Sequence, residues 1–282
     1  MASHDHHPHQ HASTAGILAY RDGELVPRTD RLAGEEPLEI RAAGPGQEPV
    51  AVAVTMRTPG HEDELAVGFL VTEGLVEPGD VLAIEHGDPG SLARPDDTAV
   101  ARLGRPLDPS RVATRHFVAT ASCGICGKAS IDEIEVRAGA LAAGPVVDPS
   151  VILGLPDRLR AAQEVFEATG GLHAAGLFDP AGRLLAIRED VGRHNALDKL
   201  IGAEALAGHL PLADRIVLVS GRISFELVQK AAVAGVPILC AVSAPSDLAV
   251  EAGARLGMTL VGFLRRDRFN VYSRPERIGA AP

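Results

Sequence analysis

The sequence has no tryptophan, only 3% aromatic residues and three cysteines among 282 residues. Because aromatic side chains are scarce, we expect cores built from aliphatic residues. With so few cysteines and no charged segment followed by an apolar one at the start, the sequence argues against a secreted disulfide scaffold and favours the cytoplasm. Apolar runs such as 236–242 are far shorter than the ~20 residues of a membrane span. A membrane partner is therefore not expected.

The formal charge of −10, from 27 basic and 37 acidic residues, disfavours nucleic acid and anionic membranes as partners. An anionic ligand would have to meet a local basic cluster. The length predicts two domains. We expect residues 1–14, which are rich in histidine and poor in apolar residues, to form a disordered tail. Residues 15–148 and 149–282 are then the two domains, divided at an Ala/Gly/Pro-rich linker at 138–149.

The first domain is predicted to be small and irregular α+β. A hairpin at 37–41 and 50–56 flanks a Gly/Pro-rich turn, and a helix follows an acidic start at 58–64 and ends near Gly74. Short strands are expected at 81–85, 99–103 and 116–119, and a helix at 128–136.

The second domain is predicted to be more regular. A helix at 156–168, started by Pro156, precedes a hairpin at 172–178 and 184–187. Helices at 193–206, 224–234 and 246–256 then alternate with strands at 215–219, 236–242 and 259–264, and Ser224 and Ser246 are the expected N-caps. This order predicts α/β architecture in which helices cover both faces of a mixed sheet. It resembles the three-layer, cytidine-deaminase-like fold.

The first domain carries two cysteines, Cys123 and Cys126, in the stretch Cys-Gly-Ile-Cys-Gly. Glycines 124 and 127 free the backbone around both sulfurs. A predicted helix N-terminus and Lys128 would stabilise a thiolate. The pair therefore predicts a loop with reactive thiols. The alternative is that both cysteines are buried packing residues in a tight turn.

Three functional interpretations of this pair stay open on the residues alone. A zinc site needs about four ligands, and the pair supplies two, while Cys240 lies in an apolar strand. We therefore expect no metal within one chain, although a homodimer would pool two pairs. A thioredoxin-like role fits the strand–loop–helix position but lacks βαβ surroundings. A sulfur carrier needs a nucleophilic thiolate on a loop that can swing.

Two further segments are rich in polar groups. Residues 188–199 join the predicted hairpin to a helix, and either Asp190, Arg193 and His194 pair with one another at the helix start or they contact a ligand. A deaminase would carry zinc ligands here and two cysteines on the next helix, which this sequence lacks.

The other segment begins at the end of the last predicted strand and places three arginines within four positions. Arginine forks match phosphate oxygens, and an aromatic residue could stack on a base, against the alternative of a solvated turn. Its members are Phe263, Leu264, Arg265, Arg266, Asp267 and Arg268.

Several of these stretches together resemble the formate dehydrogenase accessory sulfur carriers, the FdhD family. The resemblance rests on Cys123-Gly-Ile-Cys126-Gly, Gly171-Leu-His-Ala-Ala175, Glu189-Asp-Val-Gly-Arg-His194, Leu227-Val-Gln-Lys230, Ala241-Val-Ser-Ala244 and Thr259-Leu-Val-Gly-Phe263. It spans the chain beyond the histidine-rich start.

The resemblance implies a sulfurtransferase that accepts sulfur from a cysteine desulfurase and passes it to the molybdenum cofactor before insertion into formate dehydrogenase. Cys123 would form the persulfide and Cys126 would support it. Residues 263–268 would bind the guanine dinucleotide form of the molybdopterin cofactor, for which GDP is a mimic. The alternative from another class is a non-catalytic cofactor chaperone whose cysteines hold zinc across a dimer.

Overall fold

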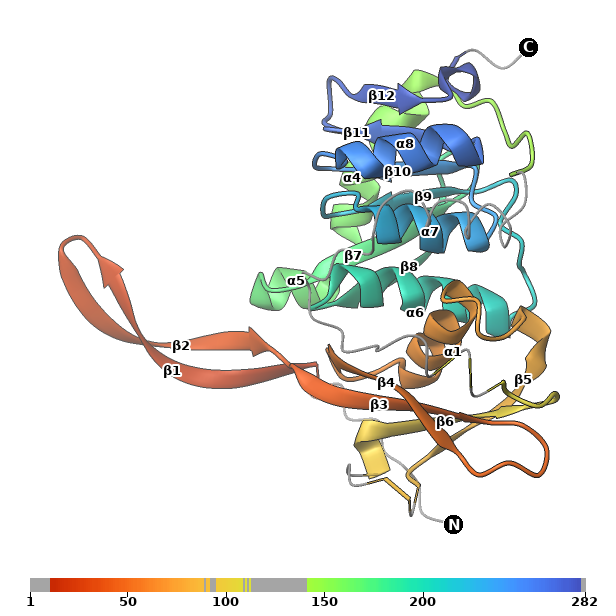
Figure 1. Cartoon of the computed structure of the whole chain (residues 1–282). Helices are drawn as coiled ribbons and strands as arrows, with labels where there is room; N and C mark the ends of the chain where they lie inside the picture. Colours follow the sequence, from red (N-terminus) through yellow and green to blue (C-terminus); the bar gives the residue numbers. More distant parts are fainter. Residues whose placement is uncertain are drawn as a thin grey trace.

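The computed structural model describes residues 11–88, 90–91, 95–108, 110, 112 and 141–279. Figure 1 shows a six-stranded sheet with its helices in one half, a smaller four-stranded sheet in the other, and a two-stranded arm that projects sideways. The result is a mixed α/β molecule. Among the described residues, no helix combines the length and the apolar character that a membrane crossing would need.

The arm is an antiparallel hairpin of β1 (Ala12–Arg21) and β2 (Glu24–Ala33). Most of its side chains are exposed, so its sequence lacks the alternation of apolar and polar residues that identifies a half-buried strand. Sequence reasoning therefore missed it. Residues 12–14, which we assigned to the tail, open β1, and residues 1–10 lie outside the described part of the chain.

The smaller sheet has the strand order β4-β3-β6-β5. The predicted hairpin is confirmed as β3 (Glu36–Ala43) and β4 (Val50–Arg57), and β5 (Val81–His86) and β6 (Thr98–Leu103) complete the sheet. Helix α1 (Glu62–Thr72) packs on one face, and short 3-10 turns lie at Pro78–Asp80 and Pro95–Asp97. Aliphatic side chains fill the contact, as expected: Leu38, Ile40, Leu65, Leu70 and Ala101 are fully buried. The predicted strand at 116–119 and helix at 128–136 fall outside the described residues.

The larger sheet has the order β12-β11-β10-β9-β7-β8. Its strands are β7 (His173–Phe178), β8 (Leu184–Asp190), β9 (Ile216–Val219), β10 (Ile238–Ala241), β11 (Thr259–Gly262) and β12 (Asn270–Ser273). Strands β9, β10 and β11 run parallel, while β7 is antiparallel to β9 and β12 is antiparallel to β11. The sequence did not predict β12, which returns from the arginine segment to the sheet edge.

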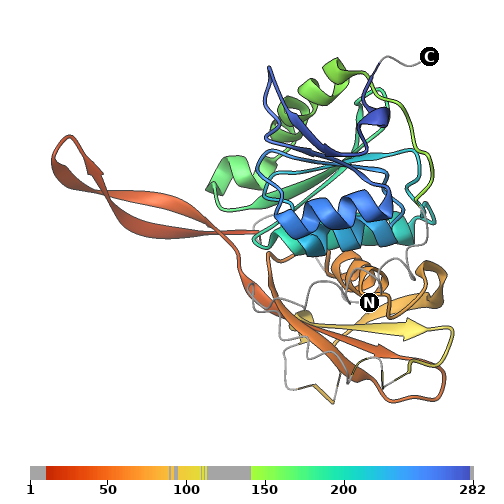
Figure 2. The same ribbon diagram turned by 45° about the horizontal axis from the view of Figure 1, so that its top comes forward.

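Helices cover both faces of this sheet (Figure 2). Helices α6 (Arg193–Leu206), α7 (Phe225–Val233) and α8 (Asp247–Leu256) share one core with the sheet, and α4 (Pro149–Ala161) shares another. The two cores take alternate residues of the same strands, as in Leu239 and Cys240 of β10. Three layers therefore result.

The helix predicted at 156–168 is wrong in its start and its continuity. The structure has α4 at Pro149–Ala161 and α5 at Glu164–Thr169, with Pro156 inside α4. Asp148 caps α4 by accepting a hydrogen bond from Ser150 N at 2.8 Å, and Pro149 occupies the first turn. The signal for the helix start was therefore present seven residues upstream of Pro156.

Candidate functional site

The arginine segment at 263–268 is a loop that joins β11 to β12; we call it the arginine loop. It begins at the carboxyl end of β11, the edge at which β9 and β10 also end. Open α/β sheets commonly bind ligands outside the carboxyl ends of their parallel strands. The hydrogen bond from Arg265 N to Arg268 O, at 2.8 Å, closes the loop.

Phe263 starts this loop in a strained conformation. Its φ angle is 50°, in the left-handed region that bulky residues rarely adopt, and 44% of its surface is exposed. The hydrogen bonds from Phe263 N to Ser243 O and from Leu264 N to Ala241 O, both at 3.1 Å, hold the backbone there. Leu264 is fully buried and anchors the turn in the core, so it is not available to a ligand. The ring of Phe263 is thereby presented at the sheet edge.

The three arginines of the loop differ in what they contact. Arg265 donates to the carbonyl oxygens of Val242 and Leu264, which ties the loop to the end of β10. Arg266 pairs with Asp157 at 2.9 Å, and Arg268 pairs with Asp267 at 3.4 Å, and all four of these side chains are more than half exposed. Exposed ion pairs contribute little free energy. Arg266 and Arg268 can therefore exchange their carboxylates for a phosphate at low cost.

The segment at 188–199 forms the contact between the two halves of the molecule. Asp190 and Lys199 are buried, with Lys199 Nζ 2.7 Å from Asp190 Oδ2. Thr58, in the other half, donates its backbone N–H to Asp190 at 3.0 Å and accepts from Lys199 Nζ at 2.8 Å. Asn195 extends the network by donating to Met56 O at 2.8 Å. The polar residues of this segment are thus largely structural.

Asp190, Arg193 and His194 do not pair with one another, so that part of the sequence interpretation is wrong. Asp190 accepts from Gly192 N at 2.8 Å, and His194 Nε2 lies 3.1 Å from Ser224 Oγ. Because Ser224 uses its hydroxyl in this way, it does not cap α7 with its side chain, whereas Ser246 does cap α8. Arg193 has no hydrogen-bond or ion-pair partner among the described residues.

The surroundings keep His194 neutral. Burial, and then the positive charges of Arg193 and Lys230, lower the pKa of His194 to about 4. Glu226 lies 3.9 Å from the same Nε2 atom that meets Ser224. A catalytic triad needs the acid on the opposite ring nitrogen, which orients the imidazole toward the serine. This arrangement is therefore not a serine nucleophile site.

A second polar network crosses between the two halves at Lys230. Its Nζ lies 2.9 Å from Asp198 Oδ2 and 2.9 Å from Glu73 Oε1, and 3.0 Å from Thr72 Oγ1. Burial alone would lower the pKa of Lys230, but the two carboxylates outweigh burial and hold that pKa above its usual value. Lys230 is therefore a charged structural tie.

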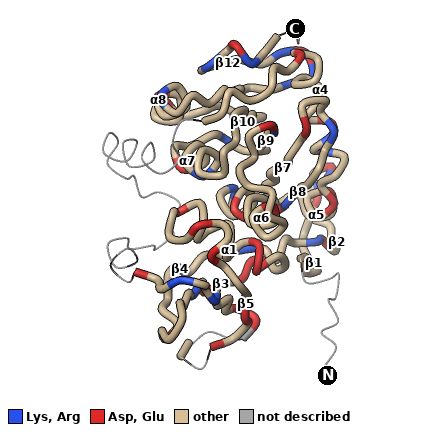
Figure 3. Tube along the Cα trace, turned by 90° about the vertical axis from the view of Figure 1, so that its right-hand side faces the viewer, with Lys and Arg blue, Asp and Glu red and all other residues tan. Residues whose placement is uncertain are grey.

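An ion pair between Arg188 and Glu64 completes the contact, with Nη2 to Oε1 at 2.7 Å. Although burial opposes ionisation, hydrogen bonds from Arg188 and His61 lower the pKa of Glu64 to about 2. In Figure 3 several acidic positions gather around α1 and β5, which fits the acidic first turn of α1.

The expected sulfur residues, Cys123 and Cys126, lie outside the described residues, so their positions relative to the arginine loop are not described. Cys240 is fully buried in β10, and burial raises the pKa of its thiol. It is unsuited to sulfur chemistry at the surface. The described part of the chain contains no group of three or more His, Cys, Asp or Glu side chains that could hold a metal ion.

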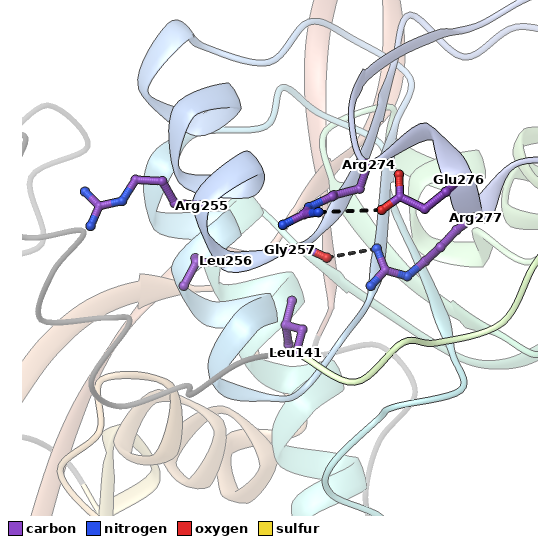
Figure 4. Close-up of a pocket in the computed structure, with 7 residues that line it drawn as sticks. All are labelled: Leu141, Arg255, Leu256, Gly257, Arg274, Glu276 and Arg277. Atoms are coloured by element: carbon purple, nitrogen blue, oxygen red, sulfur yellow. Dashed lines mark hydrogen bonds and ion pairs between the residues drawn. The ribbon is translucent and has the colours of Figure 1, made fainter.

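Away from the carboxyl edge of the larger sheet there is a pocket of about 230 Å³, and Figure 4 shows the residues that line it. It is lined by Leu141, Arg255, Leu256, Gly257, Arg274, Glu276 and Arg277. Gly257 precedes β11, so the pocket is at the amino end of that strand, opposite the arginine loop. Arg277 donates to Gly257 O at 2.8 Å and Arg274 lies 3.8 Å from Glu276. These contacts fasten the C-terminal segment to the sheet.

Comparison with known proteins decides the family. The model of the FdhD/NarQ family matches residues 33–279. The chain belongs to this family. A protein of Mycolicibacterium paratuberculosis named sulfur carrier protein FdhD is 49% identical over 267 residues, covering 91% of this chain and 95% of that protein. A protein of the same name from Picrophilus torridus is 39% identical, covering 94% of this chain and 98% of its own.

A solved structure supports the fold. The crystal structure of a formate dehydrogenase accessory protein from Desulfotalea psychrophila has a TM-score of 0.71 and 24% identity, covering 95% of this chain and 99% of that one. Most of the arm precedes the family match, which starts at residue 33, whereas the arginine loop and the segment at 188–199 lie within it.

Sequence reasoning missed the role of the residues that join the two halves. Asp198 and Lys230 each occupy a helix position that an isolated helix would leave in solvent or pair locally. Their partners, Thr72 and Glu73, are more than 120 residues away in sequence. A charged residue within an otherwise apolar helix face, as at Lys230 in α7, was the only available signal.

Proposed function

We propose that this chain is a sulfurtransferase that carries sulfane sulfur from a cysteine desulfurase to a molybdenum cofactor destined for formate dehydrogenase. The observation that carries the proposal is the arginine loop, an exposed aromatic ring beside two replaceable arginine ion pairs at the carboxyl edge of the sheet, in a chain whose relatives are named sulfur carrier proteins. Its proposed partners are a cysteine desulfurase and the catalytic subunit of formate dehydrogenase, and the proposed place of both interactions is the cytoplasm.

The proposed ligand is the bis-molybdopterin guanine dinucleotide form of the cofactor, which is a substrate and not a resident group. Arg266 and Arg268 would meet its phosphates with charge-assisted, forked hydrogen bonds. Phe263 would stack on the guanine base, because its ring is exposed and its backbone is fixed. Arg265 and Leu264 would position the loop, and Asp267 would release Arg268 when the ligand binds.

The proposed chemistry uses the two cysteines of the chain and a cellular thiol reductant. The Cys123 thiolate attacks the sulfane sulfur of the desulfurase persulfide; a new S–S bond forms on Cys123, and the desulfurase cysteine leaves as a thiolate. Cys126 then attacks the Cys123 sulfur, which forms a disulfide and releases the outer sulfur as hydrosulfide for the cofactor. A cellular thiol reductant must reopen that disulfide.

The test incubates the chain with a cysteine desulfurase and cysteine and measures its intact mass. We expect the added mass of one sulfur atom, removed by a thiol reductant and absent in Cys123→Ala. The matched control is Cys240→Ala, which should keep the adduct. No adduct on the natural chain would refute sulfur transfer. Stoichiometric zinc that is lost in Cys123→Ala would instead favour a cofactor chaperone with zinc held across a dimer.

Nucleotide binding is tested separately with GDP as the probe. Changing Arg266 and Arg268 together to glutamine should weaken GDP binding in calorimetry by at least ~100-fold, since charge-assisted hydrogen bonds contribute ~1.5–3 kcal/mol each. Asp157→Asn is the control, because it removes the partner of Arg266 without removing an arginine.

The proposal includes a cytidine-deaminase-like architecture for the second domain, with which the three layers are compatible.

A further inference from the structure

A second cationic feature lies at the same sheet edge, where Arg193, His173 and Gly221 come together. Gly221 lies two residues beyond the end of β9, and His173 begins the neighbouring antiparallel strand β7. A Cβ atom placed on Gly221 would lie 3.4 Å from His173 Nδ1 and 3.7 Å from Arg193 Cδ. The three residues therefore surround one point, and the glycine keeps side-chain atoms away from it.

Arg193 differs from the other cations that are withdrawn from solvent. Its Nε atom is buried and has no hydrogen-bond acceptor, and within the described ranges its guanidinium forms no ion pair. By contrast, Lys199, Lys230 and Arg188 each meet a carboxylate within 3 Å. Leaving a buried donor unsatisfied costs about 1–3 kcal/mol. The Nε donor of Arg193 thus lacks an acceptor among the described residues.

The position of Arg193 at the start of α6 adds positive potential around its guanidinium group. It is the first residue of α6, whose N-terminal end carries a partial positive charge, and no acidic residue occupies the first turn. An arginine is favoured at the opposite end of a helix. The local potential at this point is therefore positive and suited to an anion.

His173 adds a second donor without a partner. It is partly buried, and its side chain makes no hydrogen bond to any described residue. Burial, followed by the charge of Arg193, lowers the pKa of His173, while Asp190 acts weakly in the other direction. A bound anion would offset the repulsion between Arg193 and a protonated His173. The hydroxyl of Ser220 is also near, since its Oγ accepts from Ala174 N at 2.9 Å and its own hydrogen remains to donate.

We propose that Arg193, His173 and the Gly221 backbone form a binding site for a phosphate group. This inference rests on the proposed function for its ligand, because the site shares an edge with the arginine loop. Strands β9 and β11 are separated by β10, which places the two cationic features about 10 Å apart along that edge. A ligand with several phosphates, extended along the carboxyl edge, would contact both.

The probes that test the site are inorganic phosphate and GDP, each titrated against the full-length chain. Phosphate binding is followed through the NMR signals of His173. The pKa of the His173 side chain should rise when phosphate binds. Arg193→Gln should weaken phosphate binding at least ~10-fold, as expected for the loss of one charge-assisted hydrogen bond or more. Arg193→Lys should restore part of it, because it returns the charge but not the fork.

The matched control changes Arg266 and Arg268 to glutamine. This variant should keep the change in the His173 NMR signals on phosphate binding, and it should bind GDP more weakly. Because Arg193 forms no hydrogen bond or ion pair with the residues that the structure describes, Arg193→Gln should not lower the melting temperature in the absence of phosphate, so a folding defect would itself contradict the assignment. Phosphate binding that is absent in the natural chain, or unchanged in Arg193→Gln, would overturn the site. Persulfide formation on Cys123 does not depend on Arg193, so that assay decides the proposed function independently.

Discussion

Gly68 of α1 and Gly202 of α6 face each other where the two halves of the molecule meet. A Cβ atom on Gly68 would lie 1.8 Å from the backbone oxygen of Asp198, and one on Gly202 would lie 1.8 Å from the backbone oxygen of Glu64. The helices therefore cross with their backbones in contact, and no side chain fits between them. This close crossing is what brings the polar networks of Asp190 and Lys230 within hydrogen-bond distance of the first half.

Replacing either glycine should force the helices apart. We expect Gly68→Ala and Gly202→Ala each to lower the free energy of unfolding by at least about 2 kcal/mol, because backbone atoms cannot move aside as a flexible side chain can. Urea unfolding followed by circular dichroism measures the effect. Gly16→Ala, where an added Cβ meets nothing within 4 Å, is the control and should be neutral. Equal stability of the three variants would show that the crossing is not close.

His194 should give the protein a component of acid sensitivity. Its pKa of about 4 lies below its ordinary value of 6.5, so the unfolded chain binds more protons between these pH values. Stability from this group is therefore complete above pH 6.5 and lost as pH falls toward 4, by up to about 3 kcal/mol. Its side chain is 29% exposed, which reduces that figure.

The measurement compares unfolding free energies of the natural chain and His194→Gln at pH 7 and pH 4.5. The variant should lose less stability over this range. His209→Gln is the control, since that side chain is 64% exposed, and it should follow the natural chain. Parallel pH profiles for all three would contradict a buried, neutral His194.

The regular half of the fold could be predicted because its signals are local. Short apolar runs and helix starts predicted β7, β9, β10, α7 and α8 to within a few residues, and the predicted helix 193–206 has the bounds of α6. Pro156 misled the prediction of α4, because a proline often starts a helix but here sits within one.

The site was predictable only in part. Three closely spaced arginines predicted the arginine loop. The burial of Leu264 and the strained backbone of Phe263 depend on contacts with the neighbouring strand β10, through Ala241 at its end and Ser243 just beyond it. The pairing of Asp190 with Lys199 and Thr58 depends on how the two halves meet, which the residues around position 190 do not encode. Long-range contacts of this kind leave no periodic pattern in a sequence.

Lys199 should be among the residues most costly to change. Lys199→Met would leave Asp190 buried without its counter-ion, and breaking such a pair costs about 3–5 kcal/mol. Arg183→Met is the control: it breaks a pair with Asp179 in which the arginine is 77% exposed, and the expected cost is below about 1 kcal/mol. Chemical denaturation of both variants tests this, and similar costs would contradict the difference in burial.

The arm should contribute little to the stability of the remainder. Leu18, Tyr20 and Leu25 are 63%, 73% and 62% exposed, so changing them together to threonine removes few contacts within the chain. We expect the free energy of unfolding to change by about 1 kcal/mol or less. Leu38→Ala, at a fully buried position of β3, should cost about 2–5 kcal/mol by comparison. A large loss from the arm variant would show that the arm packs on the rest of the protein.

Cys240 should be inert in the folded protein. It is fully buried between β9 and β11, and burial raises the pKa of its thiol, so almost no thiolate is exposed to a reagent at pH 8. In Cys123→Ala/Cys126→Ala, iodoacetamide should leave the native chain unmodified and add one group after denaturation. Intact mass measures both states. Rapid modification of the native double variant would place Cys240 at an accessible position, and it would then become a rival to Cys123 as the sulfur carrier.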